Sequence, residues 1–330
     1  MIKEDIIKEE IKEFLKYYPN SKVNYQDYFY SHTLDNGEIV SLETFIKENN
    51  LSKEEIKYYQ YINDEFINEI FNGIKPLYFF DVDNTITISG RLSKEKKEFI
   101  LNFKDKNRII LSTGKAYESI LDVINACALE DNYASCINGS VLVKNNKYEM
   151  INGLGDISEE LIERIIKTNI DFMYYYTDGA YVIKELNKYN KDNMEKYNEY
   201  YKINANIDYN KVVKILLFIY DGEKEKEDLI KDLIKDYKNL TCMRTAPHSY
   251  EILKYNQHKG NTVKIISNRL NHYYRASIGV GDSMNDLRML DYVGLPFVVC
   301  DANSSLKEYK FKELDSNREI DIVKLIEEYK

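Results

Sequence analysis

Residues 77–87 read LYFFDVDNTIT, and this stretch decides the fold class. Four apolar residues stop abruptly at Asp81, and a second acid, Asp83, follows two positions later. A short apolar run bounded by polar residues is typical of a buried strand. In open α/β sheets, ligands bind beyond the carboxyl ends of the strands, so we expect both carboxylates to face a site.

Outward from this strand, apolar runs alternate with helical stretches. A helical stretch at 93–104 precedes the run RIILS, and another begins at about Ala116. This alternation predicts an α/β fold with a parallel sheet and helices on both faces. The apolar runs after the first are RIILS (108–112), ASCI (134–137), VLV (141–143), ASIGVG (276–281) and PFVVC (296–300).

Residues 145–249 have a different pattern of predicted helices and strands. They predict helices at 158–168 and 224–237 and strands at 172–176, 214–220 and 250–253. That order indicates an α+β insert with a largely antiparallel sheet. The simplest interpretation is a core formed by 76–144 and 250–330, interrupted by an inserted domain at 145–249.

Residues 1–75 read as mostly helical, with apolar residues repeating at helical spacing. Ser52 and Glu55 match a capping box, in which each side chain bonds the backbone N–H of the other residue. We predict a helical N-terminal extension packed on the core. An oligomerisation element, giving a homo-oligomer through these helices, and a partner-binding module are the alternatives.

The bulk composition excludes several classes of protein. A net charge of −9 argues against a nucleic-acid binder or a protein of anionic membrane surfaces, which would carry a basic face. The four cysteines form no CxxC pair, which fits reduced thiols and a cytoplasmic protein. No run of about 20 apolar residues occurs, so no membrane span is expected.

A second acidic cluster follows the apolar strand at 276–281. In GVGDSMND (279–286), Asp282 and Asp286 lie four residues apart in a loop that enters a helix. Hard carboxylate oxygens of this kind suit Mg²⁺. A carboxylate can also attack phosphorus, and a second carboxyl can protonate the leaving oxygen. Each motif alone also fits an ordinary turn or helix cap.

Two further strand and helix ends supply groups that phosphoryl transfer needs. Ser112 and Thr113 end the RIIL strand, where a hydroxyl and exposed amides can hold phosphate oxygens. Lys259, in QHKGNTVK, precedes another helix and can neutralise charge during in-line transfer. Four such motifs in one order favour a phosphoryl-transfer enzyme.

In this order the motifs resemble those of the haloacid dehalogenase (HAD) superfamily of phosphohydrolases. FFDVDNT, IILSTGK, HKG and GDSMND are similar to its first to fourth motifs, and the resemblance runs from about Leu77 to the C-terminus. The Cof-type branch is the most similar, because its large class IIB cap is inserted between the second and third motifs and CINGSVLV resembles its NG strand. The resemblance implies a HAD-like Rossmannoid core with an α+β cap.

The resemblance also implies roles for single residues. Asp81 would be the nucleophile, Asp83 the general acid and base, Thr113 a phosphoryl-binding group with Ser112 as the alternative, and Lys259 the stabilising cation. Mg²⁺ would bind the carboxylates of Asp81 and Asp282 and the backbone carbonyl of Asp83, with Asp286 supporting them from behind. The substrate and phosphate would contact Asn285, Asn138, Gly139, Gly114 and Lys115.

Three positions depart from the family pattern. Asn84 stands where Gly is usual, and Asn tolerates left-handed backbone better than most residues. Lys115 replaces a frequent Arg, and Asp301 replaces a small or apolar residue. None of these changes removes a catalytic group.

We therefore expect a Mg²⁺-dependent phosphatase that acts on a small phosphorylated metabolite, such as a sugar phosphate, through an aspartyl-phosphate intermediate. In the insert, Arg244, His248 and the tyrosines 174–176 are candidate substrate contacts. A phosphomutase of the phosphomannomutase type is one alternative. A non-catalytic binding protein on the same fold is another, although such proteins often lose the nucleophile or a metal ligand.

Overall fold

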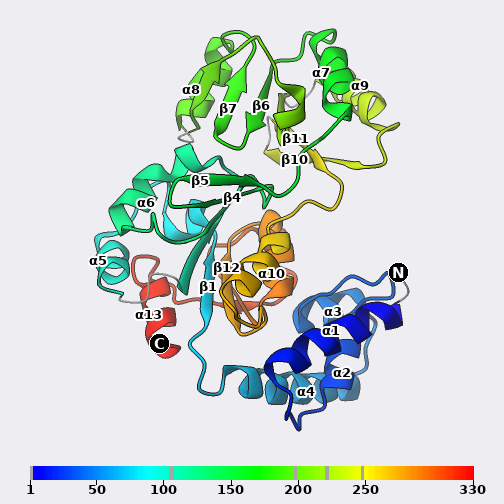
Figure 1. Cartoon of the computed structure of the whole chain (residues 1–330), viewed down its shortest axis with the longest axis vertical. Helices are drawn as coiled ribbons and strands as arrows, with labels where there is room; N and C mark the ends of the chain where they lie inside the picture. Colours follow the sequence, from blue (N-terminus) through cyan, green and yellow to red (C-terminus); the bar gives the residue numbers. More distant parts are fainter. Residues whose placement is uncertain (1–2, 104–107, 197–198, 220–222, 247–248) are drawn as a thin grey trace. The chain divides into compact units, whose positions relative to one another are not determined.

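The computed structural model describes residues 3–103, 108–196, 199–219, 223–246 and 249–330 (Figure 1). The chain forms two compact units. The first contains Met1–Ser112, Asp131–Tyr133 and Lys259–Lys330, and the second contains Thr113–Glu130 and Ala134–His258. The extension predicted at 1–75 lies in the first unit and the insert predicted at 145–249 in the second.

The core of the first unit is a parallel sheet in the order β14-β13-β12-β1-β2. In Figure 1, β1 and β12 lie side by side, as their register Leu77↔Ser277 to Phe80↔Val280 requires. All four residues of LYFF are buried, which explains why this strand has no alternating polar face. The strands are β1 (Leu77–Phe80), β2 (Ile109–Ser112), β12 (Ser277–Gly281), β13 (Leu295–Val298) and β14 (Lys312–Glu313).

Helices follow the strands, as the alternating pattern predicted. Ser93 caps the first of them by accepting from the backbone N–H of Lys96. Within the unit, α10 packs against α11 and α5 packs against α13. The helices are α5 (Lys94–Asn102), α10 (Gly260–Arg269), α11 (Leu287–Tyr292), α12 (Ser304–Lys307) and α13 (Asp321–Glu328).

The N-terminal extension is helical, as predicted. Ser52 and Glu55 form the expected capping box at the start of its longest helix. The aromatic rings of Phe14, Phe29 and Phe66 are buried and contact one another, with 4.9 Å between the ring centroids of Phe14 and Phe66. The helices are α1 (Lys3–Tyr17), α2 (Tyr25–Tyr30), α3 (Leu42–Glu48) and α4 (Lys53–Phe71).

The extension packs on the core of its unit. The ring centroid of Phe14 lies 5.8 Å from that of Tyr273, and the backbone N–H of Ser41 donates to Asp291 at 3.1 Å. Glu10 is buried and forms an ion pair with Lys264. These contacts confirm the prediction of a packed helical extension. Among the described residues, no helix has both the length and the apolar content needed to cross a membrane.

The second unit contains a sheet in the order β10-β11-β9-β6-β7-β8, antiparallel except for the pair β7 and β8. Helices α7 and α9 pack together, and their apolar residues join a core with one face of the sheet. This architecture confirms the predicted α+β character. The elements are α7 (Ile157–Ile166), β6 (Phe172–Tyr176), β7 (Gly179–Val182), α8 (Lys188–Lys196), β8 (Tyr201–Ile203), β9 (Lys214–Phe218), α9 (Lys224–Ile234), β10 (Leu240–Ala246) and β11 (Ser249–Lys254).

The second unit also contains helix α6 (Leu121–Cys127) and the strands β3 (Ala134–Cys136), β4 (Val141–Lys144) and β5 (Lys147–Met150). The pairs β3–β4 and β4–β5 are antiparallel, so the parallel arrangement expected for the run at 141–143 is wrong. Only 137–140 separate β3 from β4, whereas a parallel crossover needs a dozen residues or more. Ile137, Asn138 and Gly139 all have positive φ in this reversal.

Candidate active site

The first acid of the site continues the central strand. The backbone N–H of Asp81 donates to the carbonyl of Val280 at 3.0 Å, which prolongs the parallel pairing of β1 with β12. The next five residues, Val82–Ile86, form a tight turn in which Asn84 has φ 55°. Asparagine therefore takes the left-handed conformation expected at this position. The turn begins at Asp81, so Asp81 and Asp83 leave the sheet at its carboxyl edge.

Lys259 lies between two of the predicted acids. Its ammonium is 2.5 Å from Asp81 Oδ1 and 2.6 Å from Asp286 Oδ1, and the side chain has no solvent exposure. Lys259 immediately precedes α10, which fixes its position in the first unit. Burial disfavours the ammonium, but the negative charges of Asp286 and Asp81 outweigh burial and raise the pKa of Lys259. Lys259 is therefore a cation held beside Asp81.

Asp286 is fully engaged by protein donors. One carboxylate oxygen accepts from Lys259, and the other accepts from the backbone N–H groups of Asp282 and Ser283 at 3.0 and 3.1 Å. A Cβ at Gly281 would lie 2.4 Å from the Cβ of Asp286, so only glycine allows this approach. The arrangement fits the expected role of Asp286, which is to support the site from behind.

Three carboxylates gather at this edge of the sheet. One oxygen from each of Asp81, Asp282 and Asp286 lies within 4.8 Å of the other two. Burial, and then the charge of Asp286, raises the pKa of Asp282 to about 6. Burial also raises the pKa of Asp81; Lys259 opposes this shift, and the charges of Asp286 and Asp282 add to it. The cluster therefore has more negative charge than Lys259 alone offsets.

A buried cluster that the sequence analysis missed lies beneath the turn after Asp81. Lys96 donates to the carbonyl of Thr85 at 3.0 Å, and Arg318 contacts the carbonyl of Asn84. Asp321 pairs with both cations. Arg318 also pairs at 3.0 Å with Asp301, the residue noted as unusual, which gives that acid a structural partner.

Asn285 is the remaining predicted site residue of the first unit. Its side-chain oxygen accepts from the hydroxyl of Ser283 at 2.7 Å, and it lies in the exposed part of the loop that begins at Asp282. Ser112, the alternative phosphoryl-binding residue, ends β2 in the first unit and is buried, and the other predicted phosphate-binding residues belong to the second unit.

In the second unit, the structure brings the remaining predicted site residues together in two hydrogen-bonded loops. Asn138 N–H donates to the carbonyl of Thr113 at 3.0 Å, and Lys115 N–H donates to the hydroxyl of Thr113 at 3.1 Å. Gly114 packs closely against Asn138, because a Cβ added to Gly114 would lie 3.1 Å from the side-chain oxygen of Asn138. At Gly139, with φ 83°, an added Cβ would meet the carbonyl of His258 at 2.7 Å, so glycine is required there.

These two loops are connected to the cap sheet by a buried polar network. Lys214 donates to the carbonyl of Gly114 and to Glu251, both at 3.0 Å. The other oxygen of Glu251 accepts from the Asn138 side chain at 2.9 Å. Because both charged groups are buried and paired, this network fixes the loops that contain Thr113 and Asn138.

The candidate substrate contacts in the insert have different outcomes. Tyr174, Tyr175 and Tyr176 are buried, and Tyr174 and Tyr176 belong to the apolar core of the second unit, which does not favour a substrate contact for these two. The ring of Tyr175 lies outside that core, with the ammonium of Lys214 4.1 Å from its centroid, so Tyr175 stays a predicted contact. All five residues of β6 are buried. Arg244 is exposed and lies 3.6 Å from Glu227. His248 lies outside the described residues.

Comparison with known proteins identifies the family. The model of the haloacid dehalogenase-like hydrolases matches residues 78–326. The chain is a haloacid dehalogenase-like hydrolase. This match confirms the predicted superfamily and the predicted hydrolase class, and its first residue shows that the N-terminal extension lies outside the family region.

Relatives of this hydrolase support the assignment. It is 23% identical to the Bacillus subtilis protein named "Putative phosphatase YxeH" over 67% of this chain and 85% of that protein. A structure of TM0651 from Thermotoga maritima matches with a TM-score of 0.68 at 19% identity, over 77% of this chain and 97% of the other. The HAD subclass IIB sugar phosphatase BT4131 matches with a TM-score of 0.63 at 15% identity, over 77% and 98% of the two chains. These structural matches confirm the predicted fold.

Proposed function

We propose that this hydrolase is a Mg²⁺-dependent phosphatase that removes phosphate from a small metabolite, a sugar phosphate above all. The observation that carries the proposal is the position of Asp81, which lies at a strand end with Lys259 at 2.5 Å and with Asp282 and Asp286 beside it. A relative named as a phosphatase and a structural neighbour that is a sugar phosphatase support the same reaction class.

The donor set fits a magnesium ion. Three carboxylates and one ammonium leave an excess of two negative charges in a largely buried cluster, which a divalent cation would neutralise. Mg²⁺ prefers carboxylate oxygens and retains several waters. Since both oxygens of Asp286 are engaged, Asp81 and Asp282 are the carboxylates that would hold the ion. When bound, it would offset the charge of the phosphoryl group.

The reaction then follows from the residues of the chain. Asp81 attacks phosphorus, the bond to the leaving oxygen breaks, and Asp83 gives that oxygen its proton. Asp83 next takes a proton from water, whose oxygen attacks the aspartyl phosphate and releases orthophosphate. Lys259 offsets the charge of Asp81 throughout, and Asp286 holds Lys259 in place. Thr113 binds the transferring phosphoryl oxygens.

We also propose where this hydrolase is located and what it binds. The cysteines described are free thiols, which favours the cytoplasm. The substrate is a small molecule rather than a nucleic acid or a membrane surface. The extension is also a candidate for contacts between copies of this chain, and the measured molecular mass in solution tests that assignment.

A phosphate-release screen tests the reaction. Phosphorylated metabolites are incubated with Mg²⁺ and wild-type protein, Asp81→Asn, or the control Asp192→Asn, which changes an exposed acid of α8. We expect wild type and the control to release phosphate from at least one sugar phosphate, EDTA to abolish release, and Asp81→Asn to be inactive. Equal activity in Asp81→Asn and wild type would remove Asp81 from its role. Formation of a new phosphosugar without orthophosphate would indicate a mutase.

A further inference from the structure

A cavity lies inside the first unit, away from Asp81. Its volume is about 200 Å³. The N-terminal extension supplies one wall, which includes Tyr28, Glu43 and Asn63, and the core supplies the other, which includes Leu295 and Phe297. The family region begins at residue 78, so the extension adds this cavity to the common fold.

Arg275 lines the cavity and is 1% exposed. Its Nε donates to the hydroxyl of Tyr274 at 3.0 Å, and its guanidinium carbon lies 5.6 Å from the ring centroid of Tyr28. Within the part of the chain that the structure describes, its Nη2 has no hydrogen-bond partner. A guanidinium remains charged at all relevant pH values, and a buried donor without an acceptor costs stability. The cavity is the space from which an acceptor can reach Nη2.

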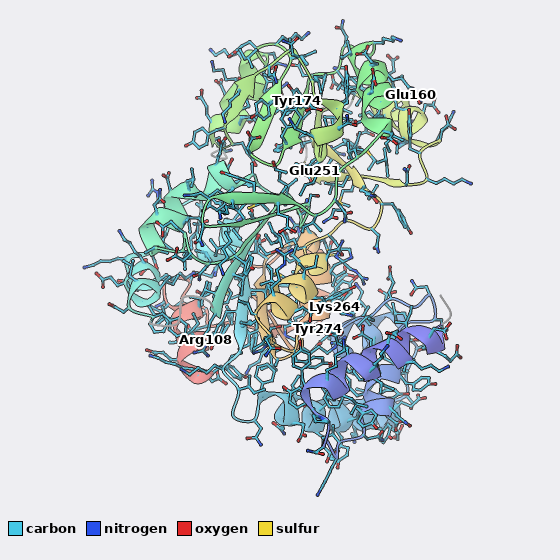
Figure 2. The ribbon with its side chains drawn as sticks, viewed as in Figure 1. Arg108, Glu160, Tyr174, Glu251, Lys264 and Tyr274 are labelled. Atoms are coloured by element: carbon cyan, nitrogen blue, oxygen red, sulfur yellow. The ribbon has the colours of Figure 1, made fainter. Side chains whose placement is uncertain are left out.

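The charges behind Arg275 favour an anion. The hydroxyl of Tyr274 donates to Glu10 at 2.5 Å, and Glu10 also pairs with Lys264, whose ammonium lies 4.6 Å from the ring centroid of Tyr274 (Figure 2). Two cations, Lys264 and Arg275, thus share one carboxylate through these contacts. Because a buried donor without an acceptor costs stability, a ligand oxygen that reached Nη2 of Arg275 would be stabilising.

The remaining lining residues restrict the anion to a single charge. Glu43 and Asp64 both line the cavity and would repel a dianion such as phosphate. The same acids would accept an ammonium group, and Leu295 and Phe297 provide an apolar wall. A guanidinium is shaped for a planar carboxylate.

We infer that this cavity binds a small organic monocarboxylate, with its carboxylate on Arg275 and the rest of the molecule between the extension and the core. The ligand is either a simple carboxylic acid or an α-amino acid, whose ammonium would face Glu43. Because the two walls come from different segments, binding stabilises the docked extension. The inference does not depend on the proposed phosphatase reaction.

Thermal unfolding and calorimetry of the full chain test the inference. The probes, each at 10 mM, are inorganic phosphate and three amino acids, L-alanine, L-valine and L-leucine. For each amino acid we also test the matching carboxylic acid, which lacks the amino group, and the matching amine, which lacks the carboxylate. A ligand that binds only the folded state raises the melting temperature, and we expect a rise of about 2 °C or more for at least one carboxylate probe. The amines should have no such effect, and any rise caused by phosphate at the active site should be unchanged by a substitution that fills this cavity. A stronger response to amino acids than to simple acids identifies the amino-acid class.

Three variants locate the binding site. Arg275→Gln removes the guanidinium, Leu295→Trp fills the cavity while it leaves Arg275 in place, and Lys94→Gln changes an exposed cation of α5 as a control. We expect the first two to weaken binding of the carboxylate by about tenfold or more and the control to bind like wild type. If Arg275→Gln fails to fold, the affinity of Leu295→Trp for the carboxylate tests the binding site instead. The inference is overturned if no carboxylate probe binds, or if Leu295→Trp binds as well as wild type.

Discussion

The ammonium of Lys96 lies 2.8 Å from a carboxylate oxygen of Asp321, and neither side chain is exposed to solvent. The pair joins α5 to α13, although 225 positions separate the two residues along the chain. Lys96 also donates to the carbonyl of Thr85, within the turn that carries Asp83 and Asn84. The geometry of the turn that follows Asp81 is therefore tied to the C-terminal helix.

Replacing Lys96 by methionine should destabilise the protein by about 3 kcal/mol, because Asp321 loses a buried partner and the Thr85 carbonyl loses its donor. Urea unfolding followed by circular dichroism measures the effect. Lys97→Met changes the exposed neighbour and should remain within about 0.5 kcal/mol of wild type. A loss below 1 kcal/mol in Lys96→Met would contradict the structural role of the pair.

Lys259→Met should lower kcat by a factor of about 10² or more on the best substrate, because Asp81 and Asp286 would face each other without their shared cation. Lys259→Arg keeps the charge but not the compact ammonium, so its kcat should lie between those of wild type and Lys259→Met. Initial rates at saturating substrate and Mg²⁺ measure both. Wild-type kcat in the methionine variant would exclude Lys259 from the reaction.

Lys214 and Glu251 should show a strong coupling in the second unit. Lys214→Met and Glu251→Gln should each destabilise the protein, and the double variant should lose about 1 to 3 kcal/mol less than the sum of the single losses. A double-mutant cycle from urea unfolding gives this value. Since the pair holds the loops with Thr113 and Asn138, kcat should fall in both single variants. Additive losses would show that the two side chains act independently.

His32 should make the protein less stable in mild acid. Burial, and then the charge of Arg275, lowers the pKa of His32 from 6.5 to about 3. Between these two values the unfolded chain binds a proton that the folded protein does not, so stability falls as the pH drops below 6.5. From pH 7 to pH 5 the loss from this residue is about 2 kcal/mol.

The variant His32→Gln isolates this effect. Its free energy of unfolding should be less sensitive to pH than that of wild type, by about 2 kcal/mol between pH 7 and pH 5. Urea unfolding at the two pH values provides the comparison, and all other titrating groups cancel in the difference. Identical pH dependence in the two proteins would mean that His32 is not held neutral by the packed extension.

The sequence predicted the parts of the site that have local signals. Asp81 and Asp282 follow buried strands, Lys259 precedes a helix, and each position is recognisable from a few neighbouring residues. The left-handed Asn84 was also expected, because asparagine tolerates that backbone. Parallel strands meet at one edge, so convergence of these residues followed from the α/β pattern alone.

The sequence did not reveal the long-range polar partners. Lys96 occurs in KEKKEF, where it looks like any solvent-facing lysine of a charged helix, and only its pairing with Asp321 explains its burial. Arg275 likewise has no local signal. Lys214 had one weak signal, since it opens the otherwise apolar strand KILLF, all of which is buried. The burial of Tyr174 and Tyr176 in the apolar core was not recognised because a strand buried along its whole length shows no alternation.

The ion pair between Glu10 and Lys264 has a consequence for synthesis on the ribosome. The two residues are 254 positions apart, so the second emerges roughly 13 to 50 s after the first at ordinary rates of translation. During that interval the aromatic cluster of Phe14, Phe29 and Phe66 has only its own helices to pack against. The nascent extension must therefore hold itself together, or be sheltered by a chaperone, until the last third of the chain arrives.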